Sequence, residues 1–174
     1  MPGILFAIHF RRLWHRTKSL LLGASCAIAL DQGLKISMRQ LVPQGTFRTV
    51  TSFFDLVHAW NPGISFGLCA CHTSGQRFLL TALTTVITGA LIMAYLRAHL
   101  VQQRFGLILI ISGAISNMID RLHHGAVFDF ISVHWGRWAF PAFNLADMLV
   151  SIGFLTLMCE NFQWKALRFS KKTP

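Results

Sequence analysis

Four aspartates lie inside or directly beside apolar segments of this chain, which has only six acidic residues among 174. They are Asp31, Asp120, Asp129 and Asp147. An ionised aspartate at the centre of a membrane-spanning helix costs roughly 2.5–3.5 kcal/mol on insertion scales, so such a residue usually has a function or a fixed partner. Two neighbouring carboxyls can share one proton, which is the chemistry of aspartyl peptide hydrolysis. We therefore expect a two-carboxylate site at a membrane surface.

Asp129 and Asp147 form the sharpest pair. Asp129 lies in an aromatic, largely apolar stretch, and burial of this kind raises the pKa of a carboxyl. Asp147 follows Pro141 near an expected helix start, where the helix dipole favours negative charge. One carboxylate could then take a proton from water while the protonated one polarises the scissile carbonyl. Each aspartate taken singly fits a structural cap better.

Further polar residues surround these aspartates in the sequence. Asp31 and Lys35 are four apart on one expected helix face, which predicts an ion pair that supports packing, with direct chemistry as the alternative. Asn117 and Arg121 share a second face and could bind a peptide carbonyl or a lipid head group, or simply anchor a helix end. Asp120 is expected to pair with Arg121 or with another basic group.

Other chemistries lack their motifs. The sequence has no His-Glu-x-x-His and no Cys-x-x-Cys pairing. The only match to Gly-x-Ser-x-Gly, residues 63–67, lies in the turn after Asn61 and does not stand out as the elbow of a serine hydrolase. His123, His124 and His134 are better explained as surface residues than as metal ligands. We therefore expect neither metal nor cofactor. The net charge of +10 comes from basic residues beside apolar spans and not from one stripe, so no nucleic-acid partner is expected. A small proton-coupled membrane transporter remains an alternative, because intramembrane carboxylates also mark proton relays.

The elements that position these residues are membrane helices. The chain is 53% apolar and only 13% charged, which is typical of a membrane protein. Apolar runs long enough to cross a bilayer predict a membrane all-α protein, with residues 1–174 forming a single integral membrane domain. Its four predicted transmembrane helices cover residues 19–38, 78–96, 105–120 and 142–159.

Two extracytoplasmic loops are predicted, at residues 39–77 and 121–141. In the first loop, Thr46–Val50 and Phe53–Val57 alternate like strands and predict a small β-rich cap. In the second loop, Phe128–Phe140 is aromatic-rich and is expected to be an interfacial segment. Ten lysines and arginines lie on the side of the two termini and five on the other side, which places both termini in the cytoplasm.

Five short blocks occur in an order that resembles the lipoprotein signal peptidase family, the bacterial signal peptidase II. They are Asp31-Gln-x-x-Lys35, Asn61-x-Gly-x-x-Phe-Gly67, Gly113-Ala-Ile-x-Asn-x-Ile-Asp-Arg121, Val127-x-Asp-Phe130 and Pro141-x-Phe-Asn-x-Ala-Asp147. Each block alone is weak, but five in order over nearly the whole chain are highly specific. The sequence departs from the family pattern at Ser112 and Ser116, where the family usually has glycine, so we expect the third span to pack slightly more loosely.

The resemblance implies an aspartyl endopeptidase of the bacterial inner (cytoplasmic) membrane, acting as a monomer with its active site toward the outer face. The implied partners are membrane lipid and diacylglyceryl-prolipoproteins, whose signal peptides it removes by cutting before the lipidated cysteine. Carried over by position, Asp129 and Asp147 are the catalytic pair. The implied substrate-binding residues are Asn61, Asn117, Arg121 and Asn144, and the implied supporting residues are Asp31, Lys35 and Asp120. A lipoprotein-binding protein without catalysis is a third possibility, which the intact pair of aspartates disfavours.

Overall fold

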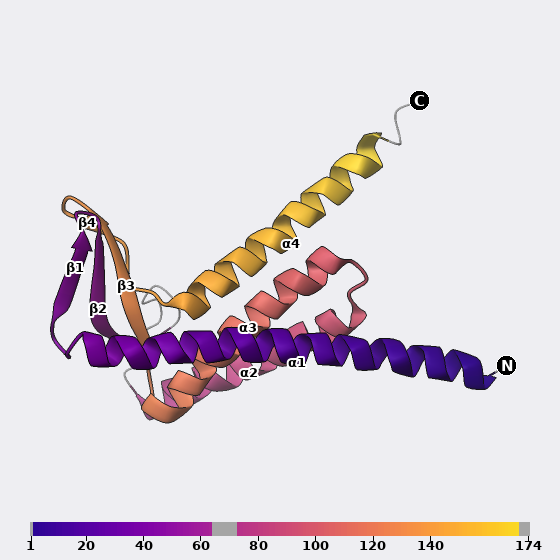
Figure 1. Ribbon diagram of the computed structural model, residues 1–174, viewed down its shortest axis with the longest axis horizontal. Helices are drawn as coiled ribbons and strands as arrows, with labels where there is room; N and C mark the ends of the chain where they lie inside the picture. Colours follow the sequence, from indigo (N-terminus) through magenta and orange to yellow (C-terminus); the bar gives the residue numbers. More distant parts are fainter. Residues whose placement is uncertain (1, 64–72, 171–174) are drawn as a thin grey trace.

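Four long helices and a small antiparallel sheet make up the computed structural model (Figure 1). It describes residues 2–63 and 73–170. The second half of the Asn61–Gly67 block lies outside these residues. The four helices are α1 Pro2–Leu41, α2 Ser74–Arg97, α3 Val101–His124 and α4 Leu145–Ser170.

Within residues 2–63 and 73–170, three helical segments are long and apolar enough to cross a membrane: Trp14–Leu41, Ser74–Arg97 and Val101–His124. They contain the first three predicted spans, which are thereby confirmed as apolar helices. Large apolar side chains on them remain on the protein surface, where lipid would solvate them; examples are Leu22, Phe78 and Val86.

The helices are longer than their predicted spans because local caps, and not the apolar runs, set their ends. A capping box between Thr73 and Gln76 begins α2 ahead of its apolar run. Gly125 ends α3 with a left-handed φ of 72°, and its N–H donates to the carbonyl of Arg121 at 3.0 Å. The helix α3 therefore extends one turn beyond the predicted membrane span of residues 105–120 and includes Arg121, as its predicted helix face with Asn117 requires.

Close backbone contact holds α3 against α4. A Cβ added to Gly113 would lie 2.4 Å from the carbonyl oxygen of Ala146, which is closer than real Cβ contacts. Gly106 and Gly153 approach each other in the same way further along the two helices. Small residues thus allow the two helices to touch, as in other membrane helix pairs.

The sheet has the order β1-β2-β3-β4, and all its pairs are antiparallel. Its strands are β1 Phe47–Thr51, β2 Phe54–Asn61, β3 Val127–Trp135 and β4 Trp138–Ala139. The predicted β-rich cap is confirmed for the first two. Most of the aromatic-rich stretch 128–140 is part of strand β3, because β2 pairs with it on both sides of one register shift between Leu56 and Ala59. That this stretch lies in the membrane interface stays a prediction.

The sheet lies at one end of the helix bundle. Figure 1 shows it opposite the end that holds the N-terminus of α1, the turn between α2 and α3 and the C-terminal part of α4. Since β3 comes directly after α3, and β2 pairs with it, the sheet brings residues from both predicted loops to the same end.

Candidate active site

The segment that leads into α4 is fixed to strand β3. Phe143 donates its N–H to the carbonyl of Ile131 at 3.0 Å, and its own carbonyl accepts hydrogen bonds from Phe130 and Ile131 at 3.1 and 2.9 Å. Asp129 precedes these strand residues, and Asn144 and Asp147 follow Phe143. This backbone pairing therefore brings the two predicted catalytic segments together.

Asn144 and Asp147 cap the start of α4 reciprocally. The N–H of Asp147 donates to the side-chain oxygen of Asn144 at 3.0 Å, and the N–H of Asn144 donates to Asp147 Oδ2 at 3.3 Å. This is the pattern of a capping box, with an aspartate in the position usually held by Glu or Gln. The helix thus begins at Leu145, and the prediction of a start beside Pro141 was wrong because Phe143 would have to give up its pairing with β3.

The same asparagine also contacts the second carboxyl. Asn144 Nδ2 donates to Asp129 Oδ1 at 2.6 Å, while Asn61 Nδ2 donates to Asp129 Oδ2 at 3.1 Å. Asp129 and Asp147 are 2% and 4% exposed, so both are almost entirely removed from solvent. One side chain, Asn144, therefore holds both aspartates in position.

Asp129 has a strongly perturbed pKa. Burial and, after it, the negative charge of Asp147 raise the pKa of Asp129 from 3.8 to about 7, against the smaller lowering effects of its hydrogen bonds with Asn61 and Asn144. The effect of Asp147 places the two carboxyls within electrostatic reach of each other. A carboxyl with a pKa near neutrality can hold a proton at physiological pH and donate it.

Asn117 connects this pair to a buried cation. Its Nδ2 donates to Asp147 Oδ1 at 3.0 Å, and its Oδ1 accepts from Asn144 at 3.2 Å and from Lys35 Nζ at 2.9 Å. Three asparagines from β2, α3 and the start of α4 thus contact the aspartates directly. The sequence predicted that these asparagines bind substrate. In the structure they donate hydrogen bonds to the two carboxyls.

Lys35 is completely buried and contacts two further aspartates. Its ammonium lies 2.8 Å from Asp31 and 2.9 Å from Asp120. The predicted Asp31–Lys35 pair is therefore present, and the partner that the structure shows for Asp120 is Lys35. With Asn117, each of the three ammonium hydrogens has an acceptor, which is the condition for keeping such a charge buried.

Asp31 extends this network to α4. It accepts the N–H of Ala146 at 2.9 Å and the hydroxyl of Ser116 at 2.7 Å. Ser116 is fully buried, so the looser packing expected there is not what the structure shows; the hydroxyl fills the space and bonds. The residue before Asp147 is thus held directly by a carboxylate from α1.

Gln32 is a network member that the sequence analysis did not single out. Its side-chain amide donates to Asp120 at 2.9 Å and to the hydroxyl and carbonyl of Ser116 at 3.0 and 3.2 Å. Its position next to Asp31 in the first block was the available signal, but nothing in the sequence distinguishes it from a lipid-facing or capping glutamine.

Arg121 holds the chain segment at the end of β2. Its guanidinium donates to the carbonyl of Gly63 at 3.0 Å. Gly63 is held from the other side, where its N–H donates to Asn61 Oδ1 at 3.0 Å. In this structure Arg121 therefore supports the segment that carries Asn61.

An apolar hollow opens beside Asp147. It measures about 260 Å³. Its lining residues are Phe140, Phe143, Asp147, Met148, Ser151 and Ile152. The carboxyl thus faces a space in which an apolar group could lie.

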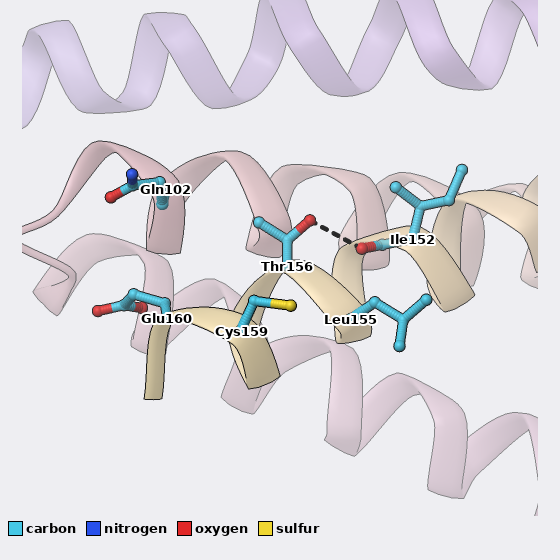
Figure 2. A pocket seen from close by; sticks show the side chains of 6 residues that line it. All are labelled: Gln102, Ile152, Leu155, Thr156, Cys159 and Glu160. Carbon is cyan, nitrogen blue, oxygen red and sulfur yellow. Dashed lines mark hydrogen bonds between the residues drawn. The ribbon is translucent and has the colours of Figure 1, made fainter. Parts of the chain in front are cut away.

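A larger hollow of about 400 Å³ lies further along α4 (Figure 2). It is lined by Gln102, Ile152, Leu155, Thr156, Cys159 and Glu160. Glu160 is about 20 Å along the helix from Asp147 at 1.5 Å per residue, so the larger hollow is not the carboxylate site. Within residues 2–63 and 73–170 no three His, Cys, Asp or Glu side chains are arranged to hold a metal ion.

Comparison with known proteins gives one consistent result. Residues 24–163 match the family model described as Signal peptidase (SPase) II. A lipoprotein signal peptidase from Azoarcus sp. (strain BH72) is 40% identical over 154 residues, which cover 87% of this chain and 84% of that protein. Another from Tolumonas auensis (strain DSM 9187 / NBRC 110442 / TA 4) is 40% identical over 139 residues, which cover 78% of this chain and 85% of that protein.

The fold has solved counterparts as well. A bacterial membrane enzyme structure obtained by the in meso method at 2.3 Å resolution has a TM-score of 0.77 and 24% identity, and the match covers 90% of this chain and 93% of that one. A second, at 1.9 Å resolution, has a TM-score of 0.71 and 25% identity over 82% of this chain and 92% of that one. The ordered motifs, the membrane fold and these relatives agree, and the chain belongs to the signal peptidase II family, a family of membrane proteases.

Proposed function

We propose that this chain is a membrane aspartyl endopeptidase that removes signal peptides from prolipoproteins, with Asp129 and Asp147 as its catalytic pair. The observation that carries the proposal is the shared asparagine: Asn144 contacts both buried carboxyls, one of which has a pKa of about 7. Such a pair can hold one proton between two acids, as aspartyl hydrolysis requires. The names of the relatives support lipoprotein precursors as substrates.

The proposed mechanism gives each carboxyl one task. Protonated Asp129 donates a hydrogen bond to the oxygen of the scissile carbonyl, while the Asp147 carboxylate takes a proton from water as the water oxygen attacks the carbonyl carbon. Asp129 is assigned the proton because burial and the charge of Asp147 raise its pKa to about 7. When the C–N bond breaks, the leaving nitrogen takes the proton from Asp147. The products are a carboxylic acid and an amine.

The substrate proposed for this site is a prolipoprotein whose cysteine carries diacylglycerol, cut just before that cysteine. The apolar hollow beside Asp147 supports an apolar substrate group close to the reacting pair. All the proposed reacting and positioning side chains come from one chain, so the proposal needs no second subunit.

The proposed topology has four transmembrane helices, with α4 as the fourth, both termini in the cytoplasm and the site at the outer face of the inner membrane. The excess of basic residues on the side of the termini supports this orientation. The position of the sheet at the opposite end of the bundle is consistent with it. The transporter alternative is not favoured, since Asp31, Asp120, Asp129 and Asp147 gather in one connected network.

The test is cleavage of a diacylglyceryl-prolipoprotein in detergent by wild type, Asp129→Asn and Asp147→Asn. Each variant should lose turnover by about a thousandfold or more, because each removes a group that takes part in the reaction. Asp55→Asn is the matched control, since Asp55 lies in β2 and pairs with His134 at 3.1 Å, away from the catalytic pair.

A parallel reaction uses the same precursor without its lipid. Cleavage should be slow with this precursor if the lipid group is part of what the site binds. Near-normal turnover by either folded dyad variant would refute the assignment of the pair, and equal rates on both precursors would refute the lipidated substrate.

A further inference from the structure

A polar hollow lies at the end of the molecule away from the sheet. It has a volume of about 400 Å³ and is formed by α1, the connection from α2 to α3 and the first turn of α3. Its lining residues are His15, Arg16, Ser19, His99 and Arg104. Four of these five side chains are basic and none is acidic, so the hollow presents positive charge and N–H donors to whatever enters it.

Arg16, the first arginine in the lining of the hollow, is held in place by the contact between α1 and α2. Its guanidinium donates to the carbonyl of Leu96, and the carbonyl of Arg16 itself accepts the hydroxyl of Tyr95 at 3.0 Å. Tyr95 is 1% exposed and belongs to the core that joins the first three helices. Arg16 is therefore held in place before any ligand arrives, which lowers the entropy cost of binding.

The second arginine has an unsatisfied donor. Arg104 Nε is buried and has no hydrogen-bond partner within the described parts of the chain. Its guanidinium and that of Arg16 both lie close enough to Tyr95 to act on its hydroxyl electrostatically. Two guanidinium groups around one hollow repel each other, and a buried donor without a partner is costly. A bound anion would remove both costs.

The hollow lies where a membrane has its head groups. The helical segments able to cross a bilayer have their ends on this side at Trp14, Arg97 and Val101, within five residues of the lining residues along the chain. Trp14 is exposed, and the ammonium of Lys18 lies 4.9 Å from its ring centre, as is typical of the interface between water and lipid. The anion available at this depth is the phosphate of a phospholipid.

We propose that this hollow binds the phosphate of an anionic phospholipid head group, held between the guanidinium groups of Arg16 and Arg104. Arginine pairs a planar fork of N–H donors with phosphate oxygens, and basic pockets between membrane helices are suited to anionic head groups. The lipid would thereby link α1 to the α2–α3 turn and stabilise the bundle at the end opposite the carboxylates. This site is separate from the proteolytic reaction and does not depend on its mechanism.

The experiment uses the full chain, purified in detergent and stripped of lipid. Thermal unfolding is followed while phosphatidylglycerol, phosphatidylcholine or inorganic phosphate is added. Phosphatidylglycerol should raise the Tm of the wild type more than phosphatidylcholine does. Arg104→Gln should need about tenfold more phosphatidylglycerol for the same stabilisation, the effect of losing one hydrogen bond to a charged group.

Arg97→Gln is the matched control, because it removes one positive charge at the same end of the molecule but outside the lining of the hollow. Arg104→Lys keeps the positive charge but lacks the planar set of guanidinium N–H donors. It replaces Arg104→Gln if that variant does not fold, and it should bind phosphatidylglycerol more weakly than wild type. An equal loss in Arg97→Gln and Arg104→Gln would overturn the site. Stabilisation by inorganic phosphate but not by phosphatidylglycerol would overturn the lipid as its ligand.

Discussion

At the scale of single residues, Asn144 has the most concentrated role. Its side-chain oxygen caps α4 through the N–H of Asp147, and its side-chain nitrogen donates to Asp129 at 2.6 Å. A residue that performs both tasks couples the start of a helix to the geometry of the carboxyl pair. The two tasks can be separated, because a serine retains one of them and loses the other.

Asn144→Ser should lower turnover by about a hundredfold, the scale expected when a reacting group is misplaced by about 1 Å. It should also cost about 1–3 kcal/mol of stability, because the buried amide that donates to Asp129 and Asn117 is lost. Serine is as good an N-cap as asparagine but has no amide to reach Asp129. Asn144→Ala should lose the same turnover and about 1 kcal/mol more stability than Asn144→Ser, because the cap is lost as well. Steady-state cleavage and thermal unfolding measure the two effects, and wild-type turnover in the serine variant would contradict the role of the amide.

Asp129 makes stability and activity depend on pH. Its pKa is about 7 in the folded chain against an ordinary 3.8, so the protonated form is favoured by folding. Its contribution to stability is therefore fully present below 3.8 and is lost as the pH rises through about 7. The Tm of wild type relative to Asp129→Asn should fall across this window.

Turnover should decline as the pH rises through about 7, because Asp129 then loses the proton with which it hydrogen-bonds to the scissile carbonyl in the proposed mechanism. A Tm difference between wild type and Asp129→Asn that stays constant with pH would show that the pKa is not raised. A rate that does not fall above about pH 7 would count against Asp129 as the proton donor.

At the scale of elements, the contact between α3 and α4 determines where Asp147 lies. Gly113 touches the turn of α4 that contains Ala146, and Ala146 is itself held by Asp31. The site therefore depends on three helices that pack closely, and on β3, to which the approach to α4 is paired. A small change in helix separation should reach the carboxyl pair directly.

Gly113→Ala tests this dependence. The added Cβ would lie 2.4 Å from the Ala146 carbonyl oxygen and 2.8 Å from Val150, so the helices must separate. We expect a loss of about 1–3 kcal/mol of stability, the usual cost of overpacking, together with lower turnover. Gly89→Ala is the matched control in α2, where nothing lies within 4 Å of the added Cβ. Equal stability and turnover in the two variants would contradict the tight contact.

At the scale of the whole molecule, the two ends of the bundle differ in kind. One end has the sheet and the buried aspartates, and the other has the basic hollow and the larger share of lysine and arginine. The proposed orientation places the first at the outer face and the second at the cytoplasmic face. A precursor anchored in the outer leaflet could then reach the carboxyls directly.

Cysteine labelling tests this orientation. With the four native cysteines replaced by alanine, Arg137→Cys in the β3–β4 turn should react with a membrane-impermeant maleimide in spheroplasts. Arg97→Cys at the other end should react only after lysis, because the membrane would separate it from the reagent. Both positions are exposed, so access to the side chain does not limit either reaction. The reverse pattern would invert the topology.

Much of this protein could be predicted from the sequence because a membrane imposes strong local constraints. Apolar runs revealed the helices, and the cost of charge in such runs made Asp31, Asp129 and Asp147 conspicuous. The Asp31–Lys35 pair followed from a spacing of four within one helix. These are properties of neighbouring residues, so they can be recognised without a fold.

The tertiary structure alone decided which distant groups meet. The pairing of Phe143 with Ile131 moved the start of α4 to Leu145, and the pairing of β2 with β3 made residues 127–135 a strand that the sequence did not predict. The tertiary structure also places three acceptors around Lys35, from α1 and α3. It brings both Asp129 and Asp147 within hydrogen-bond distance of Asn144. Contacts of this kind depend on backbone pairing and helix separation across 15 to 115 residues of sequence, which no local pattern encodes.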